Sequence, residues 1–288
     1  MTGYNKIFLV LLNLLVLSCT GNPVTENEIT FGNREISGYV KLGNNLDPEG
    51  VFVWLEGFNY SARTDENGFF KFVMPPAVVQ SNSGISGAFN LYFYMANFRL
   101  SSIVVKLNRG EFYQDPGVFD SNGQLNRPVY LSQILRIKTV MMPGTVRTSD
   151  RNLIVARMSF ATTEFDTVFV LFPSLVDGKI NPIIFKNLRN EELRIFETTI
   201  AGLPLDSDTL KITNRDPVEV VRVIRGGPSD FSVGEYKVLP FVAILQDGIP
   251  RDLIKSIGQN VNQLGPGYLK LPLFVEGGNF QVTPSFDE

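Results

Sequence analysis

The chain has 288 residues, of which 44% are hydrophobic and 19% are charged, and its formal net charge is −3. This length accommodates two or three domains of about 100–150 residues each, and the composition excludes wholesale disorder. The small negative charge, without a cluster of Lys and Arg, predicts that the protein does not bind nucleic acid.

The sequence contains no histidine, and its only cysteine is Cys19. The absence of histidine excludes Ser-His-Asp catalysis, Cys-His catalysis and histidine-bound metal sites. A single cysteine excludes a disulfide within the chain and a metal site made of several cysteines. We therefore expect no metal and no cofactor.

The first 18 residues have the pattern of a secretory signal: Lys6 is followed by an apolar run at 7–17 and then by Ser18. The apolar run is too short to span a membrane, which takes about 20 residues. Residues 16–19 read VLSC and resemble the bacterial lipobox, in which diacylglycerol is attached to the cysteine and the signal is cut just before it. The resemblance implies a signal peptide at 1–18 and lipid on Cys19. The alternatives are an ordinary secretory signal with an incidental cysteine, or a buried amino-terminal strand.

A lipid on Cys19 predicts where the protein resides. Two or three acyl chains hold a protein firmly on a membrane, because each buried CH₂ contributes about 0.8 kcal/mol. We therefore expect a protein of the cell envelope, anchored to the outer membrane if the cell has two membranes. Residues 19–35 are polar and rich in turn formers, which is typical of a short tether between membrane and first domain.

Beyond the tether the pattern indicates strands throughout. Short alternating or apolar runs are separated by Gly, Pro, Asn and Asp, as in β-sandwiches. Helical periodicity is weak and favours only one short helix, at 250–257. The fold predicted is all-β, with tandem β-sandwich domains, and the expected strands are 35–41, 51–56, 69–73, 89–96, 103–108, 134–141, 153–161, 167–172, 193–199, 218–224, 236–245 and 268–275.

The segment 114–127 is dense in turn formers and poor in aliphatic residues, which favours a domain boundary there. The first domain is then expected at 36–112 and a second sandwich region at 128–288. That region forms either one large sandwich or two small Ig-like domains, and the glycine- and proline-containing stretch 225–233 is the candidate break between them.

Three segments of the first domain carry a family resemblance: 36–40 reads ISGYV, 50–57 reads GVFVWLEG and 64–72 reads TDENGFFKF. In order and spacing they resemble the opening strands and hairpin of the carboxypeptidase regulatory-like domain, a small transthyretin-like β-sandwich. A polar insert at 80–87 departs from the tight turn that the family has before its next strand. The resemblance implies a non-catalytic accessory module, and nothing after about residue 110 shares it.

Within the third segment, Asp65 and Gly68 bracket a turn. Asp65 can cap such a turn, and Gly68 can take the positive φ that it requires. A calcium loop is the alternative interpretation. It needs six to eight oxygen ligands, and no long acidic loop is present. We therefore expect a hairpin turn.

Aromatic residues provide the candidate binding surface. In the strands expected at 51–56 and 89–96, side chains alternate between the two faces of the sheet. If Val51, Val53 and Leu55 point inward on the first strand, and Leu91 and Phe93 on the second, the aromatics between them point outward. The outward aromatics are Phe52, Trp54, Tyr92 and Tyr94. An exposed aromatic patch marks a contact with a ligand, a partner or another domain.

The carboxylate pairs of the chain do not indicate an active site. Each lies in a polar turn or at the C-terminus rather than across a recognisable cleft, as a glycosidase requires; the pairs are Asp206 with Asp208, Glu191 with Glu192, and Asp287 with Glu288. We therefore expect a protein that is not an enzyme.

The function expected from the sequence is a lipid-anchored, non-catalytic binding or scaffold protein of the cell envelope, whose partner is another envelope protein. Two alternatives stay open. One is a surface lipoprotein that binds polysaccharide through its outward aromatics, and the other is a lipid-anchored hydrolase that uses carboxylates.

Overall fold

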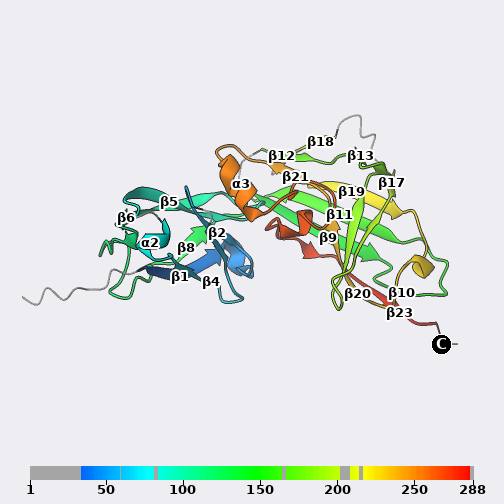
Figure 1. The fold of residues 1–288 in the computed structure, drawn as a ribbon. Coiled ribbons are helices and arrows are strands. Elements are labelled where there is room, and N and C mark those ends of the chain that lie inside the picture. The colour runs from blue at the N-terminus through cyan, green and yellow to red at the C-terminus, as the bar shows by residue number, and fades with distance from the viewer. Residues whose placement is uncertain are drawn as a thin grey trace, which may run out of the picture.

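The structure is a computed structural model that describes residues 34–58, 60–80, 84–163, 167–201, 208–213 and 217–285. Cys19 and the expected signal peptide lie outside the described residues. Two β-sandwich units lie end to end, with α3 (Arg251–Ile257) at their junction (Figure 1). Strands dominate the described residues, so the predicted all-β sandwich fold is confirmed. None of the helices in the described ranges has the length and apolar character that a membrane span requires.

The first unit packs a five-stranded antiparallel sheet against a three-stranded one. The larger sheet has the order β3-β2-β5-β6-β7, with β2 (Phe52–Leu55), β3 (Ser61–Arg63), β5 (Gly87–Tyr94), β6 (Ser101–Asn108) and β7 (Glu111–Phe112). The smaller sheet has the order β4-β1-β8, with β1 (Glu35–Leu42), β4 (Phe69–Val73) and β8 (Val129–Leu131). Strand β1 pairs antiparallel with β4 and parallel with β8.

The core of this unit lies between the two sheets. Alternation along β2 and β5 turns Val53 and Leu91 inward, and β4 contributes Phe70, whose ring meets that of Phe93 edge-on at 5.3 Å. The turn predicted before β4 is present, because Asp65 Oδ1 accepts hydrogen bonds from the backbone N–H groups of Asn67 and Phe69, each at 2.9 Å. It is not a hairpin, since it leads from β3 of the larger sheet to β4 of the smaller sheet and these two strands do not pair. Gly68 has a φ of 78° in this turn.

The first unit continues beyond residue 112. Phe119 and Leu125 insert into its core, and β8 then completes its smaller sheet. The close packing of Leu125 on β1 requires glycine at position 38, because a Cβ there would lie 2.8 Å from Leu125 Cδ1. The turn formers at 114–127 therefore belong to a loop that covers the first sandwich. Leu131, the last residue of β8, is also the last residue in sequence of the strands that form this unit.

The second unit contains three sheets. Their orders are β17-β19-β11-β9-β22, β10-β23-β20-β15-β16 and β18-β12-β21. The strands are β9 (Leu135–Met142), β10 (Thr145–Arg147), β11 (Val155–Thr162), β12 (Val168–Leu171), β15 (Ile183–Asn187), β16 (Leu193–Phe196), β17 (Thr198–Ala201), β18 (Thr209–Ile212), β19 (Val218–Ile224), β20 (Gly234–Pro240), β21 (Ala243–Leu245), β22 (Glu276–Gly277) and β23 (Asn279–Thr283). A small hairpin joins β13 (Leu175–Val176) to β14 (Lys179–Ile180).

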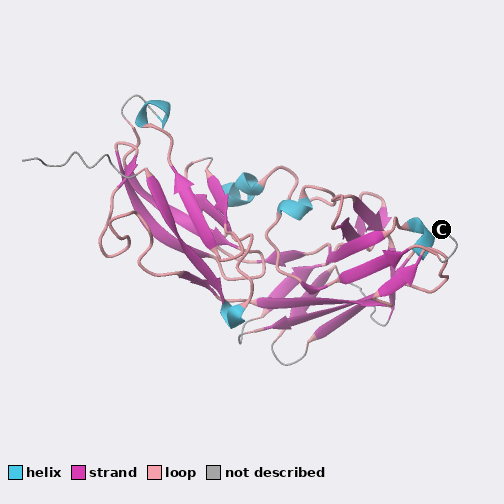
Figure 2. Cartoon of the chain, turned by 90° about the horizontal axis from the view of Figure 1, so that it is seen from below, coloured by secondary structure: helices cyan, strands magenta, loops and turns pink. Residues whose placement is uncertain are grey.

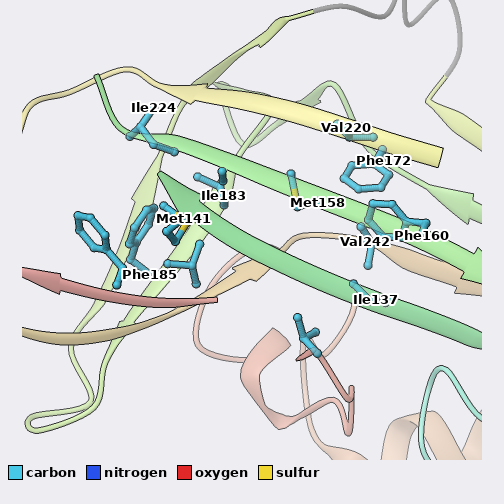
Figure 3. Close-up of a cluster of buried hydrophobic side chains, with 14 of the residues drawn as sticks. Ile137, Met141, Met158, Phe160, Phe172, Ile183, Phe185, Val220, Ile224 and Val242 are labelled. Carbon is cyan, nitrogen blue, oxygen red and sulfur yellow. The ribbon is translucent and has the colours of Figure 1, made fainter. Parts of the chain in front are cut away.

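One buried cluster draws side chains from all three of these sheets, among them Met158, Phe160 and Phe185 (Figure 3). The segment 225–233 connects β19 to β20 through a short 3-10 helix, Pro228–Asp230. It places Phe231 in the same cluster, 5.0 Å from the ring of Phe185. The segment is thus a loop packed into this unit.

The short helices lie at loops and at the junction between the units (Figure 2). In the described residues they are η1 (Gly43–Asn45), α2 (Ala77–Gln80), η2 (Pro228–Asp230), α3 and η3 (Tyr268–Lys270). The helix predicted at 250–257 is present as α3. The strand predicted at 268–275 is wrong, because η3 occupies its start and Pro272 has no N–H with which to continue a ladder.

Candidate functional site: the junction between the units

The four predicted aromatics share the outer face of the larger sheet of the first unit. The register of β2 and β5 pairs Phe52 with Tyr94 and Trp54 with Tyr92. The rings of Trp54 and Tyr92 stack, with centroids 5.8 Å apart and planes 20° apart. Trp54 Nε1 donates a hydrogen bond to the Phe58 carbonyl at 3.0 Å. Strand alternation thus collects aromatic surface on this face.

Residues of the second unit cover most of this face. Leu253 and Ile257 of α3 pack against Phe52, Trp54 and Tyr94 in one buried cluster. Trp54 is only 4% exposed as a result. Tyr92 lies at the margin of the cluster and stays half-buried. In this structure the aromatic face is therefore a contact between the two units.

Hydrogen bonds at the junction fix the two units to each other. Asn97 is fully buried, and its Nδ2 donates to the carbonyls of Leu135 at 3.0 Å and Phe274 at 2.9 Å. Gln246 Nε2 donates to the carbonyls of Ala96 at 3.1 Å and Phe98 at 2.9 Å. Buried amide groups with their partners satisfied make an interface geometrically specific.

Arg63 connects β3 to the C-terminal part of the second unit. Its guanidinium donates to the carbonyls of Gly50, at 3.0 Å, and of Lys270. It also lies over the ring of Phe52, 5.5 Å from the centroid. Partial burial lowers the pKa of Arg63. These contacts close one side of the aromatic cluster.

A pocket of about 620 Å³ lies beside the aromatic cluster, between the first unit, β21 and α3. Its walls are mostly apolar and include Tyr94, Leu171, Phe241, Ile244 and Ile254. Pockets of about 300–1,000 Å³ at the contact between domains are typical sites for small ligands. This pocket is the strongest candidate for a functional site that the described residues offer.

Two tyrosines in this pocket differ in their hydrogen bonding. The Tyr268 hydroxyl is 3.0 Å from the carbonyls of Pro240 and Val242, to which it can donate, and accepts from the Val242 N–H at 3.1 Å. The Tyr94 hydroxyl has no hydrogen-bond partner among the described residues, although its side chain is only 4% exposed. Burial raises the pKa of Tyr94 to about 12 and also raises the pKa of Tyr268. Tyr94 therefore presents a neutral hydroxyl that a ligand can use.

The charge of the pocket comes from Arg251, which stands at the start of α3 and is exposed. Arg251 forms no ion pair with a described residue, and no carboxylate is among the described lining residues. The nearest acidic residue in sequence, Asp252, instead pairs with Lys255 at 2.7 Å. The pocket thus combines apolar walls with a cation that is free to bind a ligand.

The carboxylate pairs noted in the sequence do not form a site in the described part of the chain. Glu191 pairs with Lys186 at 2.9 Å, and the hydrogen bond from Lys186 lowers the pKa of Glu191. Glu192 pairs with Arg194 at 3.0 Å. Asp208 Oδ1 accepts a hydrogen bond from a loop N–H. The other three members, Asp206, Asp287 and Glu288, lie outside the described residues. Nor do the described residues contain a cluster of acidic, histidine or cysteine side chains placed to hold a metal.

The sequence analysis singled out Tyr94 but missed the rest of the pocket. Arg251 and Ile254 lie about 160 residues away in the chain, in the one predicted helix. A signal for them was present: an amphipathic helix among strands needs an apolar surface to cover, and the outward aromatics provide one.

No family model matches the chain, and no curated protein matches it. Among solved structures it is similar to a candidate carbohydrate-binding protein from Bacteroides uniformis, at 11% identity over 75% of this chain and 100% of that one, with a TM-score of 0.33. BcpA, the major pilin subunit of Bacillus cereus, is 11% identical over 71% and 63% of the two chains, with a TM-score of 0.26. A DUF3823 family protein from Bacteroides ovatus is 10% identical over 68% and 96%, with a TM-score of 0.23. Likenesses of this strength concern β-rich architecture and carry no argument about function.

Proposed function

We propose that this chain is a lipid-anchored, non-catalytic binding protein of the bacterial cell envelope, and that its ligand binds in the junction pocket. The observation that carries the binding proposal is the pocket itself: an apolar space of about 620 Å³ in which the polar groups of Tyr94 and Arg251 have no partners among the described residues. The anchoring proposal rests on the lipobox-like sequence that ends at Cys19.

The alternatives from the sequence have less support. Polysaccharide binding through the aromatic face requires open rings, whereas Phe52, Trp54 and Tyr94 are covered by α3 and its neighbours. Hydrolysis by paired carboxylates requires a cleft. Glu191 and Glu192 instead form salt bridges with Lys186 and Arg194 in a surface turn. We keep the proposal that the partner is another envelope protein. Such a partner would bind by inserting an apolar group into the junction pocket.

The anchor is tested on the full chain in a bacterial host. Growth with a clickable palmitate analogue should label the protein, and Cys19→Ser should abolish the label and release the protein from the membrane fraction. Unlabelled wild-type protein in the soluble fraction contradicts the anchoring proposal.

The pocket is tested with a chain that begins at residue 34, which retains all of the buried apolar clusters described above. Ala243 lies exposed on the short strand β21 and lines the pocket, so Ala243→Phe fills the pocket without disturbing a core. Ser102→Phe, at an exposed position on β6, is the matched control.

The neutral fluorescent probe N-phenylnaphthylamine should bind to the wild-type chain and to Ser102→Phe. Its affinity for Ala243→Phe should fall by roughly tenfold or more, because the added ring occupies the space that the probe needs. Equal binding to all three proteins contradicts the assignment of the pocket as the site.

A further inference from the structure

The walls of the junction pocket suit a chain-like apolar ligand. They are made mainly by aliphatic side chains from separate elements, including Leu171 of β12, Ile244 of β21 and Ile254 of α3. The aromatic residues among the described lining residues are Tyr94, Phe241 and Tyr268, and the rings of Phe241 and Tyr268 pack edge-on against each other, with centroids 4.8 Å apart. Flat aromatic platforms that would stack on a sugar ring therefore do not dominate these walls. Apolar walls of this kind favour the burial of hydrocarbon.

The charge of the pocket selects the head group of such a ligand. Arg251 is the charged residue among the described lining residues, and the acidic residues close to it in sequence, Asp247 and Asp252, do not line the pocket. A guanidinium binds a carboxylate through paired, charge-assisted hydrogen bonds. Arg251 would repel a cationic head group, and a neutral head group would form a weaker hydrogen bond with it than a carboxylate does.

Tyr94 adds a second polar requirement. Tyr94 lines the pocket, and its hydroxyl lacks a hydrogen-bond partner among the described residues. A polar group that a bound ligand encloses without a hydrogen bond is costly. The hydroxyl is neutral and can donate a hydrogen bond. A ligand oxygen atom that accepts this hydrogen bond removes the cost.

Building on the proposed function, we infer that the ligand is an amphipathic carboxylate of the fatty-acid type. Its acyl chain lies against the apolar walls, its acid group pairs with Arg251, and one of its oxygen atoms accepts a hydrogen bond from Tyr94. The site would thus take a free fatty acid or a lipid fragment that ends in a carboxylate.

The inference is tested with three probes of equal chain length: lauric acid, lauryl alcohol and the dodecyltrimethylammonium ion. Each is titrated calorimetrically, below its micelle concentration, into the chain that begins at residue 34. Lauric acid should bind roughly tenfold more tightly than the alcohol, as expected for a charge-assisted pair, and the cation should bind most weakly.

Two variants assign this preference to residues. Arg251→Gln should remove the preference for the acid while the affinity for the alcohol stays unchanged, and Lys138→Gln, at an exposed position on β9, should leave both unchanged. Tyr94→Phe should weaken lauric acid binding several-fold, with unchanged Trp54 fluorescence as the check that the junction is intact.

Equal affinities for the three probes, or an acid preference that survives Arg251→Gln, overturn the inference and leave the pocket proposal standing. Failure of lauric acid to bind while N-phenylnaphthylamine still binds overturns it as well. If neither lauric acid nor N-phenylnaphthylamine binds, the proposed function itself fails together with the inference.

Discussion

The side chain of Asn97 and the backbone of Phe274 exchange hydrogen bonds across 177 positions of sequence: Asn97 Nδ2 donates to the Phe274 carbonyl at 2.9 Å, and Asn97 Oδ1 accepts from the Phe274 N–H at 3.0 Å. This pairing imitates a step of a β-ladder with a side-chain amide. It joins the loop after β5 of the first unit to the segment before β22 of the second. These hydrogen bonds therefore fix the two units to each other at the junction.

Asn97→Ala should lower the free energy of unfolding by about 1–3 kcal/mol, because it leaves buried backbone groups of Leu135 and Phe274 without partners. Urea denaturation of the chain from residue 34 measures this. Asn126→Ala is the matched control, since the Asn126 amide makes its hydrogen bond at an exposed position. A loss no larger than that of the control would mean that Asn97 does not hold the junction.

Trp54 reports on the contact between the units, because it is the only tryptophan and α3 covers it. A fragment of residues 34–131 retains the strands and core of the first unit but lacks this cover. Its fluorescence should be red-shifted and more easily quenched by acrylamide than that of the chain from residue 34. Identical spectra and quenching for the two would show that the second unit does not bury Trp54.

Gly38→Ala should destabilise the first unit by about 1–3 kcal/mol, because the new Cβ would crowd Leu125 at 2.8 Å. Thermal unfolding of residues 34–131 checks this expectation. Leu125→Ala should offset part of the loss when combined with Gly38→Ala. Purely additive losses in the double variant would argue that 114–127 does not pack on β1.

Arg222→Met should stabilise the second unit. Arg222 points toward the core, as Val220 and Ile224 do, and is 2% exposed. Its Nη1 has no hydrogen-bond partner in the part of the chain that the structure describes. Burial lowers its pKa to about 10, which reflects the cost of keeping the charge there. Replacing buried charges by apolar groups gains about 1–4 kcal/mol in favourable cases.

Chemical denaturation should therefore show a raised midpoint for Arg222→Met. Arg157→Met, which removes an exposed charge from the neighbouring strand β11, should change little. A destabilised Arg222→Met would indicate that the contact of Arg222 with the ring of Phe172, at 5.4 Å, outweighs the cost of burial.

The sequence predicted much of the architecture, because its signals are local. Alternation placed the strands around Val53 and Leu91, and the turn chemistry of Asp65 placed the turn before β4. Short strands such as Val129–Leu131 and Asn279–Thr283 were missed, since they owe their conformation to pairing with distant strands and have few residues to show a period. Nothing in the sequence indicated that Arg222 is buried, because a charged side chain normally lies on the outer face of a strand.

The candidate site was predictable only in part, for the same reason. Alternation identifies Tyr94 as outward-facing, but the covering of that face by α3 and the pocket that remains depend on the packing of two units. No local pattern links Arg251 to Tyr94, since the Asn97 and Gln246 hydrogen bonds that position the units join segments about 150–180 residues apart.

The most direct test of the account is photoaffinity labelling of the full-length protein in its own envelope. Cells are grown with a fatty acid that carries a diazirine and irradiated, and the crosslinked peptides are identified by mass spectrometry. Crosslinks are expected on the peptides that contain β21 and α3, and they should be lost in Ala243→Phe but not in Ser102→Phe. Crosslinks spread over other surfaces, or unchanged in Ala243→Phe, would contradict the claim that the junction pocket is the binding site.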